Sequence, residues 1–154
     1  VDIFYIGGTK NGALLGEAIV INNDKLKEDF RYHIKQKGAM LAKGRILGIQ
    51  FVELFKSNLY FDLAEHANKM AYKLSDSLKE LGYEFLTEPT SNQIFPIMDN
   101  KIISILEGRY GFNVEREIND DKTAIRLVTS WATKEEAVDE FINYMKELGS
   151  VKIC

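Results

Sequence analysis

The sequence predicts a mixed α/β fold arranged in two blocks, residues 1–57 and 58–154. Short runs of apolar, β-branched and aromatic residues alternate with longer amphipathic stretches, a pattern typical of strands and helices in one fold. The pair Ser57-Asn58 interrupts a helical pattern and separates the blocks. The second block carries strand and helix patterns of its own, so we expect a compact α+β unit there, with a small sheet and flanking helices.

The composition is that of a globular protein with a slightly acidic balance. Of the 154 residues, 45% are hydrophobic and 28% are charged, and the net charge of −3 argues against nucleic acids or anionic membranes as partners. No apolar run approaches the roughly 20 residues of a membrane helix. The single cysteine, Cys154, excludes an intramolecular disulfide and fits a cytoplasmic location. Because the sequence opens on a strand-like run without an initiator Met, we expect it to be a piece of a longer protein.

The first block predicts two strands and two helices. Residues 3–6 and 17–21 are short, apolar and β-branched, as expected of strands. A charged helix is expected over 25–37, where Gly38 ends it. Residues 39–56 are apolar on most faces, which predicts a helix buried inside the domain or at a subunit interface.

The second block begins with a long amphipathic helix. Its apolar positions over 60–81 repeat with helical spacing, and they are Leu63, Ala67, Met70, Ala71, Leu74 and Leu78. Strands are expected over 83–88 and 92–99, and Pro96 places the second of these at a sheet edge, since proline cannot donate to a ladder. Asn100 is expected to cap a short helix that ends at Leu106.

The chain closes with a hairpin and a helix. Residues 114–119 and 123–131 predict two strands joined by the turn residues Asn119, Asp120 and Asp121. Thr133 and Glu136 have the spacing of a capping box, so a helix is expected to begin there and to end at Gly149. Its predicted apolar stripe consists of Ala137, Val138, Phe141, Met145 and Leu148.

Lys10 stands in a loop with glycines at 7, 8, 12 and 16, between the first two predicted strands. A lysine amine that is desolvated among apolar strands becomes nucleophilic and can form a Schiff base. Small neighbours let a flat molecule approach the backbone, and the hydroxyl of Thr9 could donate to a phosphate. The alternative is a surface lysine in an ordinary polar loop, because glycine-rich loops are common between strands.

Arg126 lies in the middle of a predicted strand. Alternation places Ile125 and Leu127 on one face and Ala124, Arg126 and Val128 on the other. A buried guanidinium among small apolar residues needs an anion, and a carboxylate matches its two parallel donors. The alternative is an arginine on a solvated sheet face.

Other polar residues give weaker signals. Lys35 and Lys43 belong to a basic stretch from Arg31 to Arg45 that could hold a phosphate, although a solvated helix face explains most such charges. Neither His33 nor His66 has a second ligand at metal spacing, so no metal site is predicted.

The opening stretch, VDIFYIGGTKNGALLGEAIVI, resembles the cofactor-lysine segment of the threonine aldolase and β-eliminating lyase family. These are pyridoxal phosphate enzymes of the aspartate-aminotransferase fold. The core of the resemblance is GGTKNG followed by GEAIVI, and it continues in order through YHIKQKGAMLAKG, PTSNQIF and AIRLVTSWAT. It covers nearly the whole chain but only the C-terminal half of the family's length.

The resemblance implies roles for the candidate residues. Lys10 would be the Schiff-base lysine, and Arg126 would bind the α-carboxylate of the substrate. Lys35 falls where relatives have a lysine near the active site, and Lys43 would reach a phosphate, across a subunit interface. The turn after Lys35, GAMLAK, departs from the longer glycine run with an arginine in relatives.

The resemblance also implies an architecture and a reaction. Residues 1–57 would be the remnant of a large pyridoxal phosphate-binding domain, and residues 58–154 the small C-terminal domain. The parent protein, a homodimer or homotetramer, would cleave a small amino acid such as threonine to glycine and acetaldehyde. The alternatives are β-elimination or transamination of another amino acid, or a non-catalytic assembly fragment. The family's ring-stacking histidine, pyridine-pairing aspartate and phosphate loop would precede Val1, so we expect residues 1–154 alone to be inactive.

Overall fold

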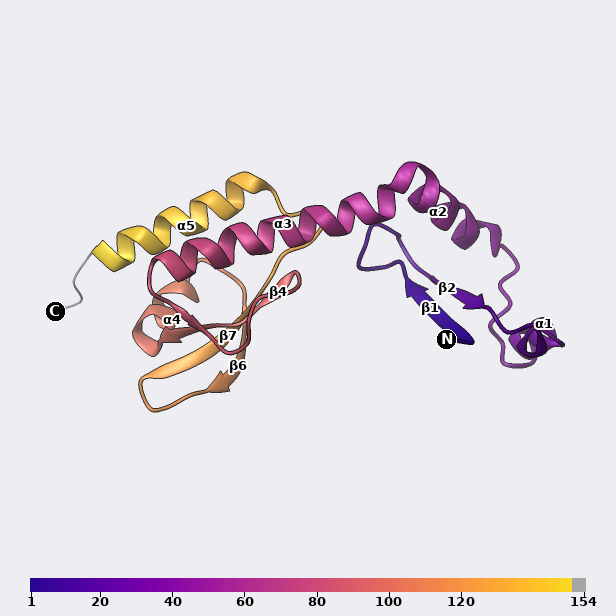
Figure 1. Ribbon diagram of the computed structural model, residues 1–154, viewed down its shortest axis with the longest axis horizontal. Coiled ribbons are helices and arrows are strands. Elements are labelled where there is room, and N and C mark those ends of the chain that lie inside the picture. The colour runs from indigo at the N-terminus through magenta and orange to yellow at the C-terminus, as the bar shows by residue number, and fades with distance from the viewer. Residues whose placement is uncertain (151–154) are drawn as a thin grey trace. The chain divides into compact units, whose positions relative to one another are not determined.

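A computed structural model describes residues 1–150 and shows two compact units that divide between Leu63 and Ala64 (Figure 1). The division falls within one continuous helix, α3, Leu59–Glu80. The expected interruption at Ser57-Asn58 is confirmed, because both residues adopt left-handed backbone angles, with φ of 55° and 63°. The assignment of these parts to a large and a small domain of a longer enzyme stays a prediction.

The first unit contains an antiparallel hairpin. Strands β1, Ile3–Gly7, and β2, Glu17–Ile21, pair from Ile3 opposite Ile21 to Gly7 opposite Glu17. Both strands lie where the sequence predicts them, because their β-branched and aromatic residues favour extended backbone.

The helices of the first unit are shorter than predicted. The helix expected over 25–37 is divided into a 3-10 turn, Asp24–Leu26, and α1, Phe30–Gln36, since Asp29 between them has a φ of 55°. Helix α2 covers only Arg45–Phe55 of the predicted 39–56.

The apolar helix, expected to be buried inside the domain or at a subunit interface, is largely exposed within the described residues, so its burial stays a prediction. Leu54 is the buried residue of α2, whereas Ile46, Ile49 and Val52 are 57%, 54% and 65% exposed. A two-stranded hairpin and its loop are too small to cover more than one side of a helix. The apolar outer side of α2 therefore faces outward in this chain.

The second unit packs two helices and a short third helix on an antiparallel sheet. The strand order is β3-β5-β7-β4, and β6 also pairs with β7. The strands are β3 Glu84–Phe85, β4 Gln93–Ile94, β5 Pro96–Asp99, β6 Asn113–Glu117 and β7 Lys122–Val128. The helices besides α3 are α4 Asn100–Leu106 and α5 Glu135–Ser150. The structure thus confirms the helix predicted over 60–81, the hairpin turn at 119–121 and the helix of the C-terminal segment, although the helices begin and end at slightly different residues.

The core of the second unit lies between the helices and one face of the sheet. In Figure 1, α5 runs beside α3, where Lys73 pairs with Glu135 and Asp139 at 2.8 and 2.6 Å. The predicted stripes of both helices are largely confirmed by the buried cluster, although Ala137 is exposed. The cluster consists of Met70, Ala71, Leu74, Leu78, Ile94, Met98, Ile102, Ile103, Leu106, Ile125, Leu127, Val138, Phe141, Ile142 and Met145.

Two local predictions about β5 and α4 were wrong. Pro96 does not mark an edge, because β5 pairs with β3 on one side and β7 on the other. Proline is tolerated there as the first residue of the strand, where the lost donor is not needed. Asn100 does not cap α4. Its side chain instead accepts from Thr123 Oγ1 at 2.8 Å and donates to Asp120 O at 3.0 Å, which ties the helix to the hairpin.

The prediction of a capping box at the start of the last helix was also wrong. Thr133 Oγ1 accepts from Ser130 N at 2.8 Å, which stabilises the preceding turn, and α5 begins only at Glu135. Within the described residues, no helix is long and apolar enough to cross a membrane. Cys154 lies outside the described residues.

Candidate active site

Lys10 lies in the loop that joins β1 to β2, and its side chain is exposed. Three backbone hydrogen bonds close this loop. Gly8 N donates to Gly16 O at 3.2 Å, and Asn11 N and Ala13 N both donate to Gly8 O at 3.0 Å. The loop is therefore a defined structure and not a loose connection, and Lys10 projects from it.

Two glycines of the loop are required by close contacts and by conformation. A Cβ atom at Gly8 would lie 2.8 Å from the Cβ of Ala13 and 2.9 Å from Cζ of Phe51. Gly12 has a φ of 98°, which L-residues with side chains rarely adopt. At Gly7, by contrast, an added Cβ would meet nothing within 4 Å, so the space beside the backbone is open there.

Side chains from α2 and α3 fasten the loop from outside. On α2, Gln50 accepts from Leu14 N through Oε1 at 2.6 Å and donates to Leu15 O through Nε2 at 3.4 Å. In the first turn of α3, Tyr60 donates from Oη to Gly7 O at 2.9 Å, and Tyr60 O accepts from Nδ2 of Asn11 at 2.7 Å. The loop thus contacts α2 and the first turn of α3.

Nothing in the sequence predicts the anchoring roles of Gln50, Tyr60 and Asn11. The bonds concerned join residues 35 to 53 positions apart, and no local pattern reports such contacts. Only Asn11 belongs to the segment that the resemblance singles out.

Arg126 lies in β7 and is half-buried. Asn113 of β6 is its cross-strand partner. On the other side, the register that pairs Ile94 with Leu127 and Ile97 with Ala124 places Phe95 opposite Arg126. The predicted separation of faces is confirmed for the core side, where Ile125 and Leu127 are buried.

The guanidinium of Arg126 contains a buried donor without a partner. Its Nε atom is buried and makes no hydrogen bond in the described part of the chain. An unpaired buried donor is costly, and a charged one more so. Arg126 is thus partly buried and not fully solvated, and its role as a carboxylate ligand stays a prediction.

The end of β7 beyond Arg126 is firmly held. Thr129 Oγ1 donates to Ala67 O of α3 at 2.7 Å, and Asn92 Nδ2 donates to Thr129 O at 2.7 Å. These bonds fix the strand on the helix and so fix the backbone from which Arg126 extends.

The remaining predicted site residues are exposed and are not gathered around Lys10. Thr9, Lys35 and Lys43 are exposed, and no hydrogen bond or ion pair joins any of them to Lys10 within residues 1–150. Lys35 lies in the last turn of α1, and Lys43 lies in the turn before α2.

The histidines have other surroundings. A ring nitrogen of His66 is 2.8 Å from Thr133 O, which gives it a structural hydrogen bond, and His33 is exposed on α1. Across residues 1–150, no group of three or more His, Cys, Asp or Glu side chains is placed to hold a metal ion.

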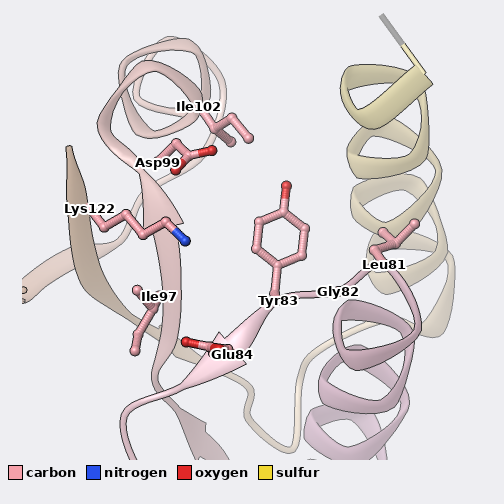
Figure 2. Close-up of a pocket in the computed structure, with 8 residues that line it drawn as sticks. All are labelled: Leu81, Gly82, Tyr83, Glu84, Ile97, Asp99, Ile102 and Lys122. Atoms are coloured by element: carbon pink, nitrogen blue, oxygen red, sulfur yellow. The ribbon is translucent and has the colours of Figure 1, made fainter. Parts of the chain in front are cut away.

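A cavity of about 260 Å³ in the second unit does not coincide with the predicted site (Figure 2). It is lined by Leu81, Gly82, Tyr83, Glu84, Ile97, Asp99, Ile102 and Lys122. The pKa of Tyr83 is raised, first because the phenol is partly buried and then because Asp99 carries a negative charge. No predicted site residue lines it, so Lys10 and Arg126 remain the candidates.

Comparison with known proteins finds similarity to threonine aldolases. No family model matches the sequence. The chain is 34% identical over 141 residues to the low specificity L-threonine aldolase of Pseudomonas sp. (strain NCIMB 10558), and 33% identical to that of Pseudomonas aeruginosa. A solved Leishmania major threonine aldolase is 44% identical, with a TM-score of 0.91 over 96% of this chain. Over the part that it spans, the chain is thus similar in sequence and fold to threonine aldolases.

The chain spans only part of the length of these threonine aldolases. Each of the two sequence matches includes 91% of this chain but only 40% of the relative. The structural match includes 43% of the solved Leishmania chain. Sphingomonas wittichii serine palmitoyltransferase, at 18% identity and a TM-score of 0.65, shares the fold. The predicted fold class, that of pyridoxal phosphate-dependent transferases, is confirmed by these neighbours.

Proposed function

We propose that the protein to which this chain belongs cleaves β-hydroxy amino acids such as threonine, with pyridoxal phosphate attached at Lys10. One observation carries the proposal. In a chain similar to threonine aldolases, a lysine projects from a glycine loop whose backbone is held by internal bonds and by two helices. A surface lysine in an ordinary turn does not need that support.

The residues around Lys10 fit the cofactor that the family implies. The amine is exposed, and the open space beside Gly7 lets a flat ring approach the backbone. The hydroxyl of Thr9 would donate to the phosphate. Lys35 and Lys43 are further candidates for the phosphate cation, and both are exposed in the same unit.

Arg126 would bind the substrate through its α-carboxylate. The unpartnered Nε and one terminal nitrogen present two parallel donors, which match the two oxygens of a carboxylate. Partial burial strengthens such a pair because water screens it less. A carboxylate held at two points also fixes the direction of the bond to be broken.

The reaction needs one bond broken and two protons moved. The Cα–Cβ bond of threonine breaks, the β-hydroxyl loses its proton to give acetaldehyde, and Cα gains a proton to give glycine. When bound, pyridoxal phosphate supplies an electron sink for the pair left on Cα. The amine of Lys10, released as substrate binds, would carry the proton to Cα. Since the chain spans about two-fifths of its relatives, we infer that the base for the β-hydroxyl is supplied by another part of the parent protein.

The exposed apolar surface of the first unit supports the proposal that assembly is required. Ile46, Ile49 and Val52 on α2 are more than half exposed, and apolar surface of this extent marks an interface. The chain also spans about two-fifths of its relatives' length. We infer that the remainder of the polypeptide and a second copy cover this surface, in a homodimer or homotetramer, and that residues 1–154 alone are inactive.

Borohydride trapping tests the proposal. The full product of the gene and, separately, residues 1–154 are mixed with pyridoxal phosphate, reduced, digested and mapped by mass spectrometry. We expect the label at Lys10 in the full product, its loss in Lys10→Ala, and no loss in the exposed control Lys146→Ala. Threonine cleavage should disappear with the label. An unlabelled Lys10 in the full product would refute the proposal, and faster elimination from tyrosine or cysteine than cleavage of threonine would favour the alternative lyase.

A further inference from the structure

Tyr60 contacts both sides of Lys10. Its hydroxyl donates to the carbonyl of Gly7, three residues before the lysine, and its own carbonyl accepts from the side chain of Asn11, the residue after it. A single residue thereby holds the two flanks of the segment that carries the amine. We propose that Tyr60, with Asn11, is a positioning residue that fixes the lysine loop for reaction, an inference that rests on the proposed role of Lys10.

Tyr60 is itself held rigidly. Its ring stacks on Phe55 at the end of α2, with a centroid distance of 5.0 Å and an interplanar angle of 24°. The left-handed residues Ser57 and Asn58 form a kink between the two aromatic residues. Left-handed angles in residues other than glycine are strained and persist where surrounding contacts require them. The turn between α2 and α3 thus places Tyr60 against the loop, at a cost in backbone strain.

Fixing both flanks of the loop has a chemical purpose. Lysine has four side-chain torsions, so a mobile backbone would add further freedom to an amine that must meet one carbonyl carbon. A loop held at Gly7 and Asn11 leaves only the side chain to be ordered. Such pre-organisation raises the fraction of encounters with productive geometry and adds no contact to the substrate.

Gln50 completes the support without touching these flanks. It bonds Leu14 and Leu15, beyond the glycine at position 12, and it also donates to Ile46 O within α2 at 3.0 Å. Its bonds hold the far side of the loop. Loss of Gln50 should therefore disturb the backbone just before β2 more than the backbone at Lys10. For this reason the positioning role is assigned to Tyr60 and not to Gln50.

The test uses four single variants of the full gene product. Tyr60→Phe removes the hydroxyl and keeps the stacked ring, and Asn11→Ala removes the amide. The first matched control is Tyr32→Phe, at a residue of α1 that is 75% exposed. The second is Asn22→Ala, which removes the hydrogen bond that the Asn22 side chain donates to Val1 O at the other end of the hairpin. One lost neutral hydrogen bond corresponds to about a fivefold change in an equilibrium.

Hydrogen exchange of the cofactor-free protein gives the first readout. The bonded amides of Gly8, Asn11 and Ala13 report on loop order. We expect exchange in the peptide over 7–16 to be about fivefold faster in Tyr60→Phe and Asn11→Ala and unchanged in both controls. Unchanged exchange in the two test variants would overturn the inference whatever the cofactor does. If Tyr60→Phe fails to fold, Asn11→Ala decides the matter alone.

Trapping of pyridoxal phosphate gives the second readout. We expect the rate of labelling at Lys10, relative to the exposed Lys146, to fall about fivefold in both test variants, while the melting temperature falls by no more than roughly 2–4 °C. We also expect kcat for threonine to fall with little change in KM. An unlabelled Lys10 in the unmodified protein would contradict the proposed function. Normal labelling of the unmodified protein with equal labelling of the test variants would contradict the positioning role alone.

Discussion

Replacement of Arg126 by methionine should stabilise the protein and at the same time weaken its activity. Methionine reaches about as far as the Nε atom of arginine and packs well in irregular apolar surroundings. The substitution removes the Nε atom that is buried without a partner. A buried unpaired donor costs about 1–3 kcal/mol, and because Arg126 is only half-buried we expect a gain near the lower limit, about 1 kcal/mol.

The same change removes the proposed partner of the substrate carboxylate. Hydrogen bonds to charged groups contribute about 1.5–3 kcal/mol each, so the loss of a two-point contact amounts to at least about 3 kcal/mol. This corresponds to a decrease of kcat/KM on the order of a hundredfold. Stability and activity should therefore change in opposite directions, which a merely structural arginine would not produce.

The assay compares thermal unfolding without substrate and threonine cleavage in the full gene product. Arg126→Met should raise the melting temperature by roughly 2–4 °C and lower kcat/KM. Arg116→Met, at an exposed position of β6, is the matched control and should leave both nearly unchanged. A lower melting temperature in Arg126→Met, or unchanged kcat/KM, would refute the assignment of an anion site to this strand.

Two further predictions concern stability. Gly8→Ala should lower the free energy of unfolding by about 1–3 kcal/mol, because its Cβ would overlap Ala13 and Phe51. Gly48→Ala has open space in α2 and should raise the free energy of unfolding by about 0.5–1 kcal/mol. Equal effects of the two changes in chemical denaturation would argue against the packed loop. The pKa of Glu135 is lowered from 4.5, chiefly by its hydrogen bond from Lys73. A lowered carboxyl pKa stabilises above the unfolded value, so the destabilisation by Lys73→Met at pH 7 should shrink as the pH falls through the folded pKa; denaturation curves that differ equally at pH 7 and pH 3 would contradict this.

The candidate site was partly predictable because its signals are local. Lys10 among glycines and Arg126 between apolar neighbours are visible in short stretches of sequence, and the structure gives both a special environment: a fastened loop and a buried unpaired donor. The supporting residues Tyr60 and Gln50 were not predictable. Each acts through a bond to a residue at least 35 positions away, and nothing in its own neighbourhood distinguishes it.

The sequence by itself determined the kind and order of most elements, because apolar periodicity and turn residues act over a few positions. It located the hairpin β1–β2, the long helix α3 and the hairpin β6–β7. Tertiary structure decided what depends on partners distant in the chain. Pro96 lies in an interior strand because β3 and β7 both pair with β5, and Thr133 bonds Ser130 instead of capping a helix. The exposure of α2 was decided in the same way, since burial depends on what else is present to cover an apolar face.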